Sequence, residues 1–382
     1  MTGENMSELI ATKEYLLKAV GAVINSDEIP KMPEDINARL LLELIVKNSL
    51  QAIGYLALKG QNFEYNDRLE RSYRTVVARE ISQQAEADRI RKDFSENEID
   101  FMFLKGSHLK KLYPAPELRF MADTDVLVRS DDVEKAKKIL LSHGFEQKAD
   151  NGKDVAFTKK PFLTVELHNT LFVEEYYMYD YFLSVWDKAQ KVGEHEYAMT
   201  DSDMYIYTAA HLAEHFTTGG ACFRPTMDIY LMRKKMSDKL DFPYIEKEFE
   251  KLSIDDFVKK IERVADGMFG NSEKDASLEV TENFIALGPP VKNTGVASVD
   301  GKDRSKAEML LISLFPSLKH MQLLFPVLKK APVLLPLFWA VRLFERLFSR
   351  NARKKLAKIK DADKKDLEIM DRIYRESGIK RR

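Results

Sequence analysis

The chain has 382 residues, 45% of them hydrophobic and 32% charged, with a formal net charge of −1 and a single cysteine, Cys222. This length supports more than one domain, and the near-neutral charge gives no overall attraction to long nucleic acids. One cysteine excludes an intramolecular disulfide and a cysteine-rich zinc site. The N-terminus shows no leader pattern, and the longest apolar run, 331–341, is about half of a membrane span. We therefore expect a cytoplasmic protein.

The chain begins with a predicted helical region, residues 1–98. Apolar residues recur at helical spacing within 9–20 and 40–45. Residues 67–97 are charged and contain no glycine or proline, which predicts a long, exposed helix.

The pattern changes to a mixed αβ core over residues 99–200. Short apolar runs predict strands, and capped runs with helical spacing predict helices between them. The expected strands are 101–104, 126–128, 155–158 and 163–168, and the expected helices are 107–113 and 130–140.

Residues 201–287 are again expected to be helical. Helical spacing and capping predict helices at 201–218, before Gly219-Gly220, and at 224–237, 243–253 and 255–269. Residues 288–304 are rich in glycine and proline and predict a linker or loop. Residues 305–382 are expected to form a helical tail. The fold class is thus α+β, a small mixed-sheet core with N-terminal and C-terminal helical regions on either side.

Three acidic residues of the core suggest a metal site. Asp123 and Asp125 lead into the apolar run 126–128 and are predicted to lie on one face of a strand end. Two like charges this close repel each other unless a cation lies between them. Glu166 sits between apolar neighbours in the strand 163–168 and shares a face with His168. A third carboxylate from a neighbouring strand would complete such a site.

The run Leu104-Lys105-Gly106-Ser107, Tyr113-Pro114, Arg119, Asp123-Thr124-Asp125 and Val165-Glu166-Leu167-His168 resembles the polymerase-β-type nucleotidyltransferase superfamily. It is most similar to the branch labelled "uncharacterised nucleotidyltransferase". Fifteen residues separate Ser107 from Asp123, which is longer than the usual spacing in the superfamily. The resemblance implies the nucleotidyltransferase core fold and an Mg²⁺-dependent transfer of a nucleoside monophosphate, with release of pyrophosphate.

The resemblance also implies a role for each matching residue. Asp123, Asp125 and Glu166 would hold two Mg²⁺ ions, with Mn²⁺ as the alternative metal, and would carry the catalysis. The nucleotide, with ATP as the first candidate, would be bound by Gly106, Ser107, Lys105 and Arg119. Lys105 could instead point to solvent. Contacts with the substrate or with the metal ligands are implied for His168, His211, His215, Arg224 and Asp228.

Several alternatives remain open at this stage. His211-Leu212-Ala213-Glu214-His215 matches a zinc-protease pattern, with Glu279 or Glu282 as a distant third ligand. Arg224 and Asp228 could form an ordinary surface ion pair on a helix. Asp-x-Asp also occurs in metal-dependent glycosyltransferases, which need a preceding sheet. A degenerate relative would bind nucleotide or a partner without turnover.

The acceptor is not identified by the sequence, and a small molecule, peptide or protein is favoured over a long nucleic acid. The tail combines aromatic residues with basic ones. From 350 to 382 it carries 13 Lys and Arg against 6 Asp and Glu. It could pack onto the body or lie on a membrane surface. The aromatic residues are Phe315, Phe325, Phe338, Trp339, Phe344 and Phe348.

Overall fold

The computed structural model describes residues 3–150, 154–174, 176–218, 222–288, 327–348 and 372–379, together with Phe315, Leu318 and Met321. Within this part of the chain, seven strands form one mixed sheet in the order β3-β4-β5-β2-β1-β7-β6. The strands are β1 (Phe101–Phe103), β2 (Thr124–Val128), β3 (Glu146–Asp150), β4 (Asp154–Lys159), β5 (Leu163–His168), β6 (Gln190–Lys191) and β7 (Glu196–Ala198). All lie inside the expected 99–200 core, and the predicted α+β class is confirmed.

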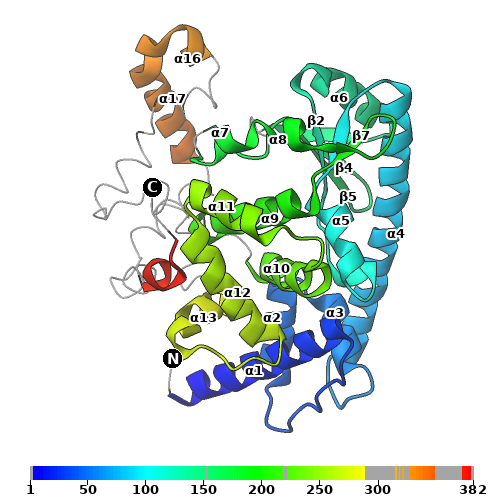
Figure 1. The fold of residues 1–382 in the computed structure, drawn as a ribbon, viewed down its shortest axis with the longest axis vertical. Coiled ribbons are helices and arrows are strands. Elements are labelled where there is room, and N and C mark those ends of the chain that lie inside the picture. Colours follow the sequence, from blue (N-terminus) through cyan, green and yellow to red (C-terminus); the bar gives the residue numbers. More distant parts are fainter. Residues whose placement is uncertain are drawn as a thin grey trace.

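Helices precede and follow the sheet (Figure 1). Before β1 come α1 (Gly3–Asn25), α2 (Ala38–Lys47), α3 (Gln51–Leu58) and α4 (Asn66–Glu96). Within the sheet region lie α5 (Lys105–Leu109), α6 (Val133–Ser142), α7 (Tyr179–Phe182) and α8 (Val185–Lys188). After β7 come α9 (Asp201–Thr218), α10 (Phe223–Met236), α11 (Phe242–Leu252), α12 (Asp255–Phe269) and α13 (Glu279–Leu287).

One face of the sheet packs against α4 and α6, which lie on its outer side in Figure 1. This core contains Ile90, Phe94, Val126, Val128, Leu140, Val165 and Leu167. Because successive side chains of a strand point to opposite faces, Asp125 of β2 and Glu166 of β5 point to the other face. That face is turned toward α9 and α10.

The helices before and after the sheet share one hydrophobic core. Helix α1 packs on α12 so closely that a Cβ on Gly21 would lie 2.8 Å from the Phe269 carbonyl oxygen. Lys13 of α1 is buried and donates a hydrogen bond of 2.7 Å to Glu282 of α13. The N-terminal helices and the helices after residue 201 therefore form a single body beside the sheet.

Several elements differ from the sequence expectation. Helix α4 is exposed on one side only, because Ile90 and Phe94 pack against the sheet. The expected helix 107–113 is the short α5 followed by a 3₁₀ turn at Lys110–Leu112. Strands β3, β6 and β7 were not predicted, since β3 is polar and the other two have only two or three residues. Strand β2 begins at Thr124, so the acids lie at its start.

The linker prediction and most of the tail fall on residues outside those described, including Phe325 and Arg350. In the described part, α16 (Val327–Lys330) and α17 (Leu335–Phe348) are helical, and the ring of Phe315 packs edge-on against Trp339. None of the helices in the described residues is long and apolar enough to cross a membrane.

Candidate active site

A cavity with about 1130 Å³ of empty space lies between the sheet and helices α9 and α10. Ten of the predicted site residues line it, namely Lys105, Gly106, Arg119, Asp123, Asp125, Glu166, His211, His215, Arg224 and Asp228. Met121, Thr208, Glu214 and Pro225 complete the lining. Ser107 and His168 are not among the lining residues. Segments more than 100 residues apart in the sequence thus meet at one cavity.

The acids meet because β2 and β5 are parallel neighbours. Asp125 pairs in register with Glu166, and facing residues of adjacent strands are separated by about 4.8 Å. Asp123 precedes the first residue of β2 and lines the same cavity. The two strands therefore deliver three carboxylates to one place, as the sequence pattern predicted.

The three carboxylates repel one another. Burial, followed by repulsion from Asp125, raises the pKa of Asp123. Burial, followed by repulsion from Asp123 and Asp125, raises the pKa of Glu166 to about 7. A divalent cation would relieve this repulsion, and clustered carboxylate oxygens are the ligands that Mg²⁺ and Mn²⁺ accept. The residues present therefore fit a divalent metal site.

Two cations flank the acids. Lys105 is only 8% exposed, and its Nζ lies 4.7 Å from the centre of the Tyr207 ring, so the prediction that it could point to solvent is wrong. Arg224 donates from Nη1 to the Phe120 carbonyl oxygen at 2.6 Å. Its Nε is buried and has no hydrogen-bond partner among the described residues. The charges of Arg224 and Lys105 both lower the pKa of Asp123, against the larger effects of burial and of Asp125.

The resemblance implies that Arg119 binds the nucleotide, but its guanidinium binds a carboxylate of the protein itself. Its guanidinium is buried and donates two hydrogen bonds of 2.8 Å to Asp228, one to each carboxylate oxygen. Tyr113 donates a third hydrogen bond of 2.8 Å to Asp228. The alternative that Asp228 forms a surface ion pair with Arg224 is wrong, because Asp228 is 1% exposed and binds Arg119.

Gly106 and Ser107 lie at the start of the short helix α5. A Cβ on Gly106 would lie 2.3 Å from Cε of Met121, so this position is crowded from the cavity side. The backbone N–H of Ser107 donates to the Leu104 carbonyl oxygen at 3.2 Å. Phosphate contacts by these two residues stay a prediction.

The histidines fall into two groups. His168 lies beside the acids, with Nε2 at 3.2 Å from Oδ1 of Asp125. His211 and His215 lie one turn apart on α9, with ring centres separated by 4.3 Å. In the zinc-protease alternative Glu279 or Glu282 would be their third ligand, and the Glu282 carboxylate binds Lys13 of α1 instead.

Two residues near the acids were not singled out from the sequence. Asp154 of β4 pairs in register with His168 of β5. Tyr207 is buried, and burial followed by the charge of Asp125 raises its pKa. Asp154 could have been found from the sequence only by pairing β4 with β5 in the correct register, and Tyr207 resembles an ordinary apolar helix residue.

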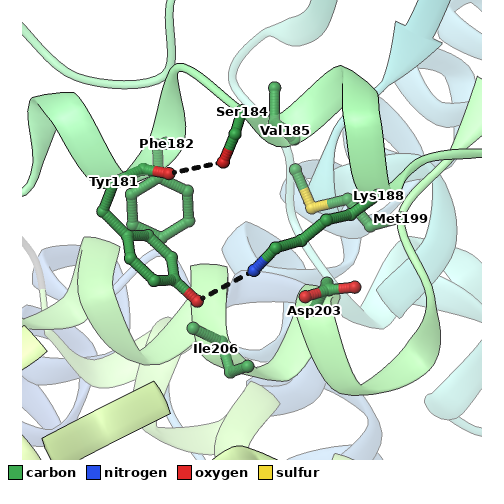
Figure 2. Close-up of a pocket in the computed structure, with 8 residues that line it drawn as sticks. All are labelled: Tyr181, Phe182, Ser184, Val185, Lys188, Met199, Asp203 and Ile206. Carbon is green, nitrogen blue, oxygen red and sulfur yellow. Dashed lines mark hydrogen bonds between the residues drawn. The ribbon is translucent and has the colours of Figure 1, made fainter. Parts of the chain in front are cut away.

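A second hollow, with about 330 Å³ of empty space, lies beside α7, α8 and the start of α9. Figure 2 shows its apolar lining, which includes Phe182, Met199 and Ile206, and the amine of Lys188 directed to the Tyr181 hydroxyl. Their separation is 3.4 Å. None of the predicted site residues lines this hollow.

A family model described as "Uncharacterised nucleotidyltransferase" matches residues 34–270, which include the whole sheet and the cavity. The chain belongs to this nucleotidyltransferase family. No curated protein and no solved structure matches the chain. The family assignment confirms the resemblance and makes the protein a nucleotidyltransferase enzyme. A glycosyltransferase is disfavoured, because residues 3–96 form helices and turns where that alternative requires a sheet.

Proposed function

We propose that this nucleotidyltransferase moves a nucleoside monophosphate from an NTP to a hydroxyl or phosphate of a small molecule, peptide or protein, and releases pyrophosphate. ATP is the first candidate donor, and the cytoplasm is the proposed compartment. The supporting observation is the cavity in which Asp123, Asp125 and Glu166 meet between Lys105 and Arg224.

In this proposal Asp123, Asp125 and Glu166 hold two Mg²⁺ ions. The metal, when bound, supplies charge neutralisation at the phosphate and a lower pKa for the attacking group. Asp123 and Asp125 would hold both ions, and Glu166 would hold only the ion that lowers the pKa of the acceptor hydroxyl. The pKa values of Asp123 and Glu166, raised in the absence of a cation, are consistent with carboxylates that need one.

The cations would bind the triphosphate. Arg224 has a buried Nε without a hydrogen-bond partner among the described residues, and guanidinium groups bind phosphate oxygens in a fork. Lys105 lines the same cavity and would neutralise a second phosphate. Arg119 would act as a positioning residue, since its guanidinium is held by Asp228. Gly106 and Ser107 would approach the terminal phosphates with backbone and hydroxyl groups.

The reaction itself is an in-line displacement at the α-phosphorus. The acceptor oxygen forms a new bond to phosphorus as the bond to the pyrophosphate oxygen breaks. The acceptor would enter along α9, where His211 and His215 face the cavity. These histidines offer nitrogen atoms that can accept or donate a proton at the acceptor.

Calorimetric titration with non-hydrolysable NTPs, with and without Mg²⁺, tests the proposal. The wild type is expected to bind one NTP preferentially and only with the metal, and Asp123→Asn/Asp125→Asn is expected to lose this binding. The matched control is Asp131→Asn/Asp132→Asn, which changes two acids just after β2 that do not line the cavity. Absence of nucleotide binding in the wild type would indicate a degenerate relative and overturn the proposal.

A further inference from the structure

His168 occupies an unusual position between carboxylates. It is 4% exposed, and its two ring nitrogens lie near different acids. Its Nε2 lies 3.2 Å from Oδ1 of Asp125 and 3.7 Å from Oε2 of Glu166. Its Nδ1 is buried without a hydrogen-bond partner among the described residues, and lies 4.0 Å from Oδ2 of Asp154.

A histidine that binds a metal does so as a neutral imidazole, so the two tautomers of His168 place its proton differently. A neutral imidazole carries one N–H and one bare nitrogen. If Nε2 carries the proton, the bare Nδ1 is buried and faces Asp154. If Nδ1 carries it, the proton points to Asp154 and the bare Nε2 faces Asp125 and Glu166. A bare nitrogen that faces carboxylates is unfavourable unless a cation lies between them.

A metal ion would make the tautomer with the proton on Nδ1 favourable, because it would lie between the bare Nε2 and the carboxylates of Asp125 and Glu166. Three ligand atoms, one each from Asp125, Glu166 and His168, lie within 4.8 Å of one another. Ligands around an ion with bonds of about 2.1 Å lie within roughly 4.2 Å of each other. The group therefore needs to close by less than about an ångström to surround an ion.

The neighbour on the far side of the ring completes the pattern. Metal-binding histidines usually donate their second N–H to a carboxylate, which fixes the tautomer and the ring orientation. Asp154 pairs in register with His168 on the adjacent strand, so its carboxylate lies on the same face of the sheet. His143, on the opposite side of the sheet, contrasts with His168, since it has carboxylates at 2.7 and 2.6 Å on its two nitrogens and no space for an ion.

We infer that His168 is a nitrogen ligand of one metal position, oriented by Asp154, and that this position selects a transition divalent cation such as Mn²⁺ over Mg²⁺. Imidazole suits first-row transition ions, whereas Mg²⁺ prefers oxygen ligands only. This inference adds a ligand and a metal preference to the proposed function, and it rests on the same acids as metal ligands.

Electron paramagnetic resonance of Mn²⁺ bound to the full-length protein tests the inference directly. Pulsed spectra are expected to show ¹⁴N modulation from a coordinated imidazole. His168→Gln should remove the ¹⁴N signal and weaken Mn²⁺ binding more than Mg²⁺ binding. Asp154→Asn should keep the ¹⁴N signal and weaken Mn²⁺ binding about 10–100-fold, the usual loss for an outer partner. His195→Gln is the control, because His195 pairs with Asp100 and does not belong to the group of Asp125, Glu166 and His168.

The outcomes separate this inference from the proposed function. Mn²⁺ bound without ¹⁴N modulation, or ¹⁴N modulation that persists in folded His168→Gln, would overturn it, even if Asp125→Asn still abolishes turnover. Nitrogen-ligated Mn²⁺ in a protein that binds no nucleotide would support the ligand assignment and overturn the proposed function. Thermal unfolding of each variant without metal shows whether a loss of Mn²⁺ binding reflects loss of the folded state. If His168→Gln does not fold, the Asp154→Asn variant decides instead.

Discussion

Asp228 on α10 binds Arg119 through both of its carboxylate oxygens, with each hydrogen bond 2.8 Å long. Both side chains are at most 5% exposed. The pair joins the segment that leads into the acids, through Arg119, to the helix that carries Arg224. It therefore fixes the distance between the two sides of the cavity.

Removing one partner of this pair should destabilise the protein strongly. Asp228→Asn leaves the buried Arg119 charge uncompensated, and losses of about 3–5 kcal/mol are typical for such changes. Urea unfolding measures the free energy of unfolding. Tyr113→Phe removes only one hydrogen bond to the same carboxylate and should cost about 1 kcal/mol. A loss below about 1 kcal/mol for Asp228→Asn would show that the pair does not hold the cavity together.

Arg224→Gln should weaken nucleotide binding with little change in stability. Hydrogen bonds to charged groups contribute about 1.5–3 kcal/mol, which corresponds to about a 10–150-fold change in affinity. Calorimetry with the preferred NTP measures this change, and Arg71→Gln on the exposed side of α4 serves as the control. Equal affinities of wild type and Arg224→Gln would exclude Arg224 from the triphosphate site.

Asp125→Asn should abolish metal-dependent turnover and leave the fold intact. The substitution removes a metal ligand at nearly constant volume, and the metal contributes several kcal/mol, so a loss of at least about 10³-fold is expected. Pyrophosphate release and circular dichroism measure the two effects, with Asp131→Asn as the matched control. Turnover near the wild-type rate would contradict the metal assignment.

Glu166 should make the metal-free protein less stable as the pH rises. Its pKa is about 7 in the folded protein, above the usual value of 4.5, because burial and the neighbouring acids disfavour its charge. The folded state thus holds this proton more tightly. Its stabilising contribution is complete below about pH 4.5 and is lost as the pH rises through about 7.

Glu166→Gln should therefore raise the stability of the metal-free protein at pH 8 by about 1–2 kcal/mol, after an allowance for solvent screening. It should change little at pH 4.5. Thermal unfolding at both pH values, with a chelator present, measures this difference. Excess Mn²⁺ should reverse the order at pH 8, because only the wild type has all the carboxylates. A Gln variant less stable than wild type at pH 8 without metal would contradict the repulsion.

The acids and the two strands that carry them could be predicted from the sequence, because alternation along a strand fixes which side chains share a face. The pairing of Asp125 with Glu166 then follows once β2 and β5 are neighbours. The partner of Arg119 could not be predicted, since Asp228 lies 109 residues away and adopts its place only when α10 packs against the sheet. Strand β7 was missed for a similar reason, because its pairing with β1 defines it more than its own residues do.

In this protein the range that matches the family is shorter than the part of the chain that packs into one body. The family match covers 34–270 and thus leaves out α1 and α13. Yet α1 lies against α12 at Gly21, and the buried Lys13 joins it to Glu282 of α13. A fragment trimmed to the matched range would expose the apolar surface of α12 to water and would be expected to aggregate. A recombinant form of this enzyme should therefore include all of α1 and all of α13.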